Sequence, residues 1–121
     1  MNGTELRDGY VVLDDGTYFV ALNTNYELQK APGFLYKRCA RTEDTPQGWE
    51  CVGGFDTAWK PVNDGKNWRA DVDAIYDEET DSDVTIVANN TTRMEAIALL
   101  WQHRHTAFSR HGKLQSSIER K

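Results

Sequence analysis

Short apolar runs alternate with polar turn segments over the first 90 residues, and this alternation is typical of antiparallel strands. The clearest hairpin joins 10–13 to 17–22 through Asp14-Asp15-Gly16, because an Asp-Gly pair tolerates the positive φ angles of a tight turn. Further strands are predicted at 34–41, 49–55, 58–60, 68–70, 72–76 and 84–88. Together these runs predict an antiparallel sheet of about five to six strands, built from hairpins.

The pattern changes to a helical spacing after residue 90. Thr92 and Glu95 fit a capping box, in which each side chain satisfies a backbone N–H that the first helical turn leaves free. Over about 92–109, largely apolar side chains recur at Met94, Ile97, Ala98, Leu100, Trp101, His105 and Phe108. This stripe requires an apolar partner, and the sheet supplies one. The sequence therefore predicts an α+β fold in which one C-terminal helix packs on the sheet, with a further short helix after Gly112.

Length and composition are those of one domain. The chain has 121 residues, of which 39% are apolar, and a chain of this size buries enough surface to form one core. We found no repeat or linker, so 1–121 is predicted to be a single domain. No apolar run approaches the roughly 20 residues of a membrane helix, and the first residues lack the pattern of a signal peptide. These features predict a cytoplasmic protein that does not contact a membrane.

The only two thiols are those of Cys39 and Cys51, and their spacing is not that of a zinc site. If 34–41 and 48–55 form a hairpin centred on Thr45, the two thiols face each other across it. Two interpretations remain open, a cross-strand disulfide and a pair of reduced thiols, and a reducing compartment favours the second. We expect no metal site and no cofactor.

The net charge of −5 conceals an uneven distribution along the chain. Residues 1–42 contain five acids and five bases, residues 43–90 twelve and three, and residues 91–121 two and six. Within the acidic part, seven carboxylates fall in thirteen residues: Asp71, Asp73, Asp77, Glu78, Glu79, Asp81 and Asp83. Such a cluster is tolerated where water solvates it or where a cation or basic partner binds it. The run lacks the glycine and the final glutamate of an EF-hand loop, which argues against calcium.

The acidic cluster is the strongest candidate binding surface, with Trp59 and Trp68 beside it as exposed aromatic anchors. In general character, a short acidic α+β chain without a catalytic motif resembles the small proteins that phages and mobile elements use to disable host machinery. This resemblance implies a binding or inhibitor protein of an anti-host or anti-defence type. Its acidic surface could act as a mimic of nucleic acid. We therefore expect a protein partner with a basic surface.

The basic end of the chain suggests an alternative function. Arg104, Arg110 and Lys113 would let the end of the helix bind nucleic acid, although the helix dipole also favours bases there. A basic tail and an acidic loop would equally allow a homodimer. An enzyme is not expected and no catalytic residue is assigned, because Gly53-Gly54 lacks the remainder of a phosphate-binding loop and His105 lacks an orienting acid. We interpret the glycine pair as a bulge or a strand crossing.

Overall fold

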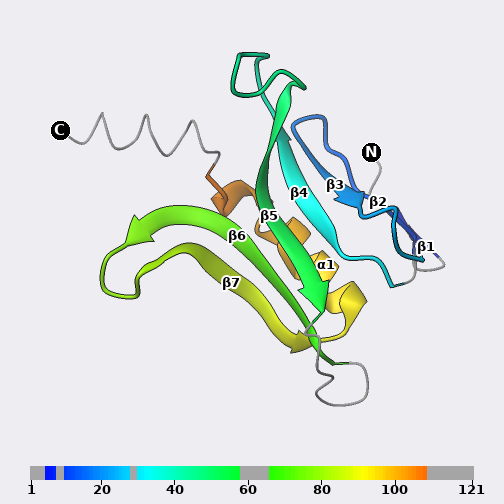
Figure 1. Ribbon diagram of the computed structural model, residues 1–121. Helices are drawn as coiled ribbons and strands as arrows, with labels where there is room; N and C mark the ends of the chain where they lie inside the picture. Colours follow the sequence, from blue (N-terminus) through cyan, green and yellow to red (C-terminus); the bar gives the residue numbers. More distant parts are fainter. Residues whose placement is uncertain (1–4, 8–9, 28–29, 58–65, 109–121) are drawn as a thin grey trace.

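The computed structural model (Figure 1) describes residues 5–7, 10–27, 30–57 and 66–108. It has the predicted α+β architecture, in which a five-stranded antiparallel sheet packs against one α-helix. The sheet is a meander, because each strand pairs with the next one along the chain. Its strands are β3 (Tyr18–Leu22), β4 (Gly33–Arg38), β5 (Trp49–Thr57), β6 (Trp68–Asp77) and β7 (Ser82–Thr91). The helix is α1 (Arg93–Gln102), and a short 3-10 helix, η1 (Arg104–Thr106), follows it.

The first predicted hairpin has its turn at the expected residues, but its two arms do not form the predicted pair of strands. β2 (Tyr10–Val12) pairs with β1 (Glu5–Arg7) in a separate two-stranded sheet, whereas β3 pairs with β4. The two arms are joined at the turn by the bridge between Asp14 and Phe19, by a bond from the Asp15 amide to the Tyr18 carbonyl and by one from the Val20 amide to the Leu13 carbonyl. The chain therefore turns at Asp14-Asp15-Gly16 as expected, but β3 takes its neighbour from the following segment.

The β4–β5 hairpin has a different register from the predicted one. Tyr36, not Cys39, lies opposite Cys51, and the Cys39 amide donates to the Gly48 carbonyl. The physical reason is the loop, where the buried Thr45 hydroxyl donates to the Ala40 carbonyl and makes the connection asymmetric. The predicted facing of the two thiols was thus wrong, and the two cysteines do not form a disulfide with each other.

Strands β6 and β7 are longer than their sequence patterns indicated. The runs 68–70 and 72–76, predicted as two strands, form one ten-residue strand, and the run 84–88 is the centre of another. The two strands form a long hairpin with irregular register, and Figure 1 shows it curving away from β5 toward its turn. The predicted strand at 58–60 lies outside the described residues.

The helix begins as predicted and ends earlier. Thr92 and Glu95 form the capping box in both directions. However, α1 ends at Gln102 instead of continuing to 109, and the predicted helix after Gly112 lies outside the described residues. The buried face is also rotated relative to the predicted stripe, since Ala98 and His105 are exposed. The residues that α1 buries are Arg93, Ala96, Ile97 and Leu100.

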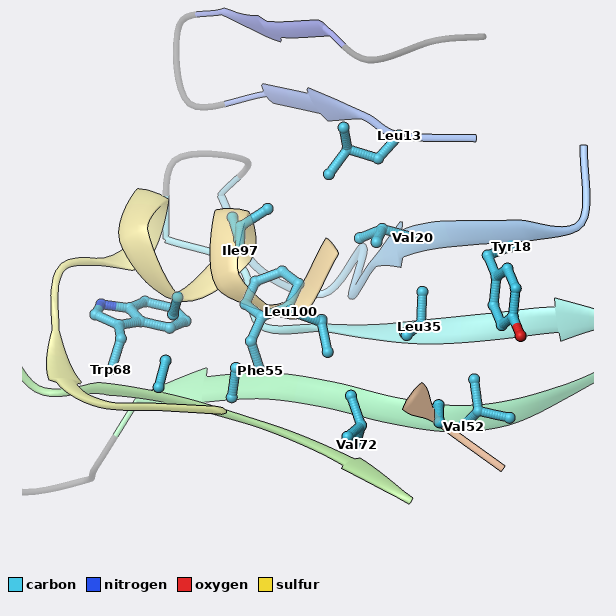
Figure 2. Packing of buried hydrophobic residues seen from close by; sticks show 14 residues of the cluster. Leu13, Tyr18, Val20, Leu35, Val52, Phe55, Trp68, Val72, Ile97 and Leu100 are labelled. Carbon is cyan, nitrogen blue, oxygen red and sulfur yellow. The ribbon is translucent and has the colours of Figure 1, made fainter. Parts of the chain in front are cut away.

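The core lies between α1 and one face of the sheet. Figure 2 shows Phe55 and Trp68 of the sheet pointing toward Ile97 and Leu100 of the helix. Arg93 enters this layer because its guanidinium donates to the Ala31 carbonyl at 3.0 Å and so satisfies a buried polar group. Among the helices that the structure describes, none has the length and apolar character needed to cross a membrane.

The opposite face of the sheet carries no helix within the described residues, and we call it the open face. Figure 1 is viewed from this side, with α1 behind the sheet. The strand registers place one row of neighbours across all five strands on it: Ala21, Phe34, Gly54, Asp71 and Ile86. Aromatic and acidic side chains therefore share one exposed surface.

Candidate functional site

A hollow of about 330 Å³ lies on the open face, over β4, β5 and β6, and we call it the open-face pocket. Its apolar lining includes Pro32 and Phe34, and three carboxylates contribute to the rest of the wall. Those carboxylates belong to Asp56, Asp71 and Asp73. The pocket thus combines an aromatic side with an acidic side.

Both residues of the pair Gly53-Gly54 lie where a side chain would meet close neighbours, Gly54 on the pocket side of the sheet and Gly53 on the side of Leu100 in the core. A Cβ at Gly54 would come within 3.1 Å of the Gly33 carbonyl oxygen and 3.3 Å of the Phe34 ring. A Cβ at Gly53 would come within 2.6 Å of the Asp71 carbonyl oxygen. The register also shifts next to this pair, because Val52 is an extra residue between paired positions on β5. The segment was interpreted as a bulge or a strand crossing, but the extra residue precedes it, and Gly53 and Gly54 themselves pair regularly with β4 and β6.

Arg69 offsets part of the negative charge of Asp56 and Asp71 on the acidic side of the pocket. Arg69 lies 3.6 Å from the Asp71 carboxylate and 3.9 Å from that of Asp56. Burial raises the pKa of Asp71, and the charges of Asp56 and Asp73 add to that rise while Arg69 opposes it. An ionised carboxylate in this position is costly and would be stabilised by an additional cation.

Five of the seven predicted acidic residues surround the β6–β7 turn, which we call the acidic tip: Asp77, Glu78, Glu79, Asp81 and Asp83. All five are exposed. The Tyr76 hydroxyl donates to the Asp81 carboxylate at 2.6 Å, and the Glu79 amide donates to that of Asp77 at 2.9 Å. These bonds shape the turn, where Asp81 has a positive φ of 54°.

Asp71 and Asp73 stand apart from the acidic tip, because they face the pocket from the middle of β6. The predicted cluster is therefore two surfaces on one hairpin. Within the part of the chain that the structure describes, no three His, Cys, Asp or Glu side chains are grouped as metal ligands.

Exposed apolar side chains accompany both surfaces. Phe34, beside the pocket, is 47% exposed, and Ile86, in the same cross-strand row, is 52% exposed. Tyr76 and Val84 near the acidic tip are also exposed. Sequence reasoning did not single out these four residues. Their signal is strand alternation, which assigns Phe34 and Ile86 to the face opposite the core once the register is known.

Of the two predicted aromatic anchors, one is buried and the other is not tested. Trp68 is only 8% exposed and lies in the core, so its assignment as an exposed anchor was wrong. The reason is its position opposite Thr57 and Thr91, which directs the ring to the face that α1 covers. Trp59 lies outside the described residues. Trp49, which was not assigned to the site, is 39% exposed on β5.

The basic residues proposed to contact nucleic acid are only partly described. The guanidinium of Arg104 donates to the Asp15 carboxylate and to the Trp101 carbonyl, both at 2.8 Å. The guanidinium of Arg104 therefore bonds within the protein and stabilises the fold. Arg110 and Lys113 lie outside the described residues, so nucleic-acid binding by this end of the chain stays a prediction.

Comparison of the chain with protein-family models, with curated proteins and with solved structures gave no match. The candidate site is therefore interpreted from its own geometry and chemistry.

Proposed function

We propose that this protein is a binding module whose β6–β7 hairpin engages a basic surface on a partner protein. The observation that carries the proposal is the acidic tip, where five exposed carboxylates surround one turn. Within the described residues, none of these five carboxylates forms an ion pair with a basic side chain. Their charge is therefore available to a partner.

Electrostatics would act mainly on the rate and specificity of such binding. Exposed charges interact over about 8 Å at physiological ionic strength, so a tip with five carboxylates would steer a basic surface toward the hairpin. Complementary charge raises association rates more than it raises affinity. We therefore expect association to slow steeply as salt is added.

Apolar contacts would supply the remaining affinity. Val84 and Ile86 lie on β7 directly after the acidic tip, and both are exposed. An apolar strip with a charged rim is the usual composition of a protein interface. Binding of this kind would cover the basic surface of the partner and inhibit any acidic ligand that uses it, which accords with the inhibitor function expected from the sequence.

The proposal is tested with two variants of equal charge. Glu78→Gln/Glu79→Gln/Asp83→Asn neutralises three acids at the tip, and Glu27→Gln/Glu43→Gln/Asp44→Asn neutralises three exposed acids elsewhere. Each variant is immobilised beside the original protein, and proteins captured from a lysate of the native host are quantified by mass spectrometry. We expect the original protein and the second variant to capture the same basic protein in similar amounts. The first variant should capture at least tenfold less of it.

The matched charge makes the outcome decisive. Equal capture by both variants, or an equal loss in both, would show that the tip has no special part in binding, and the proposal would fail. The proposal would also fail if no captured protein were reduced by the substitutions at the tip. Thermal unfolding of the tip variant should match the original protein, because these side chains are exposed.

A further inference from the structure

The open-face pocket has the dimensions of a site for one side chain. Ligand pockets in proteins range from about 300 to 1,000 Å³, and a volume of about 330 Å³ lies at the lower end of that range. The pocket is on the same hairpin as the acidic tip, because Asp71 and Asp73 precede the tip on β6. A partner that lies along this hairpin would contact both the tip and the pocket.

The strand register gives the pocket two unlike sides. Phe34 on β4 and Asp71 on β6 flank Gly54 on β5 in one cross-strand row. Neighbouring strands are about 4.8 Å apart, so the ring and the carboxylate originate roughly 10 Å from each other. Gly54 adds no side chain between them. The Phe34 ring lies within 3.3 Å of where a Cβ of Gly54 would stand, so a flat group in the pocket would lie against this ring and have the Asp71 carboxylate on its other side.

The charge of the pocket selects a cation. Three carboxylates line it, and Arg69 is the basic residue that forms ion pairs with two of them. The carboxylates come from two strands and do not converge in the way that metal ligands do. An extended organic cation would reach them better than a single metal ion.

Two arginines of the protein itself are each held between a carboxylate and an aromatic ring. Arg38 donates to both Asp14 oxygens, at 2.7 and 2.8 Å, and lies 4.4 Å from the centre of the Phe19 ring. Arg104 donates to Asp15 at 2.8 Å and lies 4.2 Å from the Trp101 ring. A guanidinium is planar, so it stacks on an aromatic face while its edge donates to a carboxylate. An ammonium group has no such flat face.

We propose that the open-face pocket binds the guanidinium of an arginine side chain presented by the basic partner, stacked on Phe34 and hydrogen-bonded to Asp71. This inference rests on the proposed function, because it names the residue of the basic surface that the hairpin anchors. Asp56 adds negative charge to the same wall, and Arg69 reduces the repulsion between the Asp56 and Asp71 carboxylates.

The test uses an isolated arginine derivative and requires no partner. Nα-acetyl-arginine amide is titrated into the ¹⁵N-labelled full-length protein, and amide chemical shifts are followed. We expect a Kd on the order of 1 mM, as is usual for a ligand of this size. The shifts should concentrate on Gly53, Gly54 and Asp71. The citrulline analogue, which has the same shape without the charge, should bind at least fivefold more weakly.

Two variants separate the pocket from general attraction. Asp71→Asn should weaken binding of the arginine derivative at least fivefold, and Phe34→Leu should reduce it by a smaller factor because the stacking surface is lost. Asp83→Asn removes the same charge outside the pocket and should leave binding unchanged. The ¹H–¹⁵N spectra of these variants report whether each is folded.

Three results would overturn the inference. They are the absence of shifts at 10 mM derivative, equal binding of the citrulline analogue, and an equal loss of binding in Asp71→Asn and Asp83→Asn. Each of them leaves the capture experiment on the acidic tip untouched. Conversely, arginine binding in the pocket combined with tip-independent capture would contradict the proposed function and leave the pocket as a guanidinium site.

Discussion

Two aspartate-rich turns of this protein differ in whether arginine side chains pair with their carboxylates. At the turn before β3, Asp14 forms a double hydrogen bond with Arg38, and Asp15 forms one with Arg104. Around the β6–β7 turn, Asp81 accepts a bond from a hydroxyl and Asp77 accepts one from an amide, and among the described residues no basic side chain pairs with the acids of the tip. Charge that the fold neutralises stabilises the fold, and charge that it leaves exposed is available for binding.

The energetics of the first turn follow from its partial burial. Burial by itself raises the pKa of Asp15, but hydrogen bonds from Arg104 and from the amides of Tyr18 and Thr17 outweigh it and hold the pKa at about 2. Both partners of the ion pair are mostly shielded, since the Asp15 and Arg104 side chains are 19% and 21% exposed. We therefore expect this pair to contribute on the order of 2 kcal/mol to stability.

The largest predicted effect is that of removing Arg104. Arg104→Met keeps most of the apolar stem but leaves Asp15 without its guanidinium and Trp101 without its stacked cation. We expect a loss of about 2 kcal/mol in the free energy of unfolding at pH 7, measured by urea denaturation. Arg41→Met removes an exposed arginine and should change stability by less than about 0.5 kcal/mol.

The same pair predicts a pH dependence. The folded-state pKa of Asp15 lies below the ordinary value of 3.8, so the unfolded chain takes up the proton first as the pH falls. Stability is therefore complete above about pH 5 and declines toward pH 2. In Arg104→Met this decline should be shallower. If stability declined as steeply in Arg104→Met as in the original protein, the ion pair of Asp15 and Arg104 would not be the source of the pH dependence.

A smaller effect is expected at the exposed half of the same turn. The hydrogen bond from Arg38, followed by that from the Gly16 amide, lowers the pKa of Asp14. The two side chains are 42% and 41% exposed, so solvent screens much of the attraction. Arg38→Met should cost about 0.5 kcal/mol, and 1 M salt should remove part of the difference. A cost as large as that of Arg104→Met would contradict the argument from burial.

The smallest predicted effect has the opposite sign. Burial raises the pKa of Asp71, so its ionised form destabilises the folded state at neutral pH. Asp71→Asn should therefore raise stability at pH 7 by about 0.5 kcal/mol while weakening binding in the pocket. The gain should disappear in acid, where Asp71 is protonated in both states. Asp83→Asn is the matched control, and no change is expected in its stability.

Residues with strong local preferences were predictable from the sequence. The capping box of Thr92 and Glu95 and the turn at Asp14-Asp15-Gly16 formed where they were expected, because each is built from hydrogen bonds between near neighbours. The concentration of acids in 71–83 was also evident, since it depends on composition alone.

Features that depend on register could not be predicted in the same way. The thiols of Cys39 and Cys51 were placed opposite each other on the assumption of a symmetric loop, and the buried Thr45 hydroxyl makes that loop asymmetric. Trp68 was assigned to the surface because nothing in its segment reveals which face of the strand the helix covers. A one-residue change of register exchanges the two faces of a strand, and this choice is made by packing.

The amino-acid sequence by itself determined the α+β class, the start of the helix and the acidity of one hairpin, because alternation, capping and charge are local properties. Only the tertiary structure decided which acids meet an arginine and which do not. Asp15 and Arg104 are separated by 89 positions in the chain, and packing of η1 near the β3 turn brings them together. The open-face pocket likewise depends on three strands in register around Gly54, an arrangement that no single segment encodes.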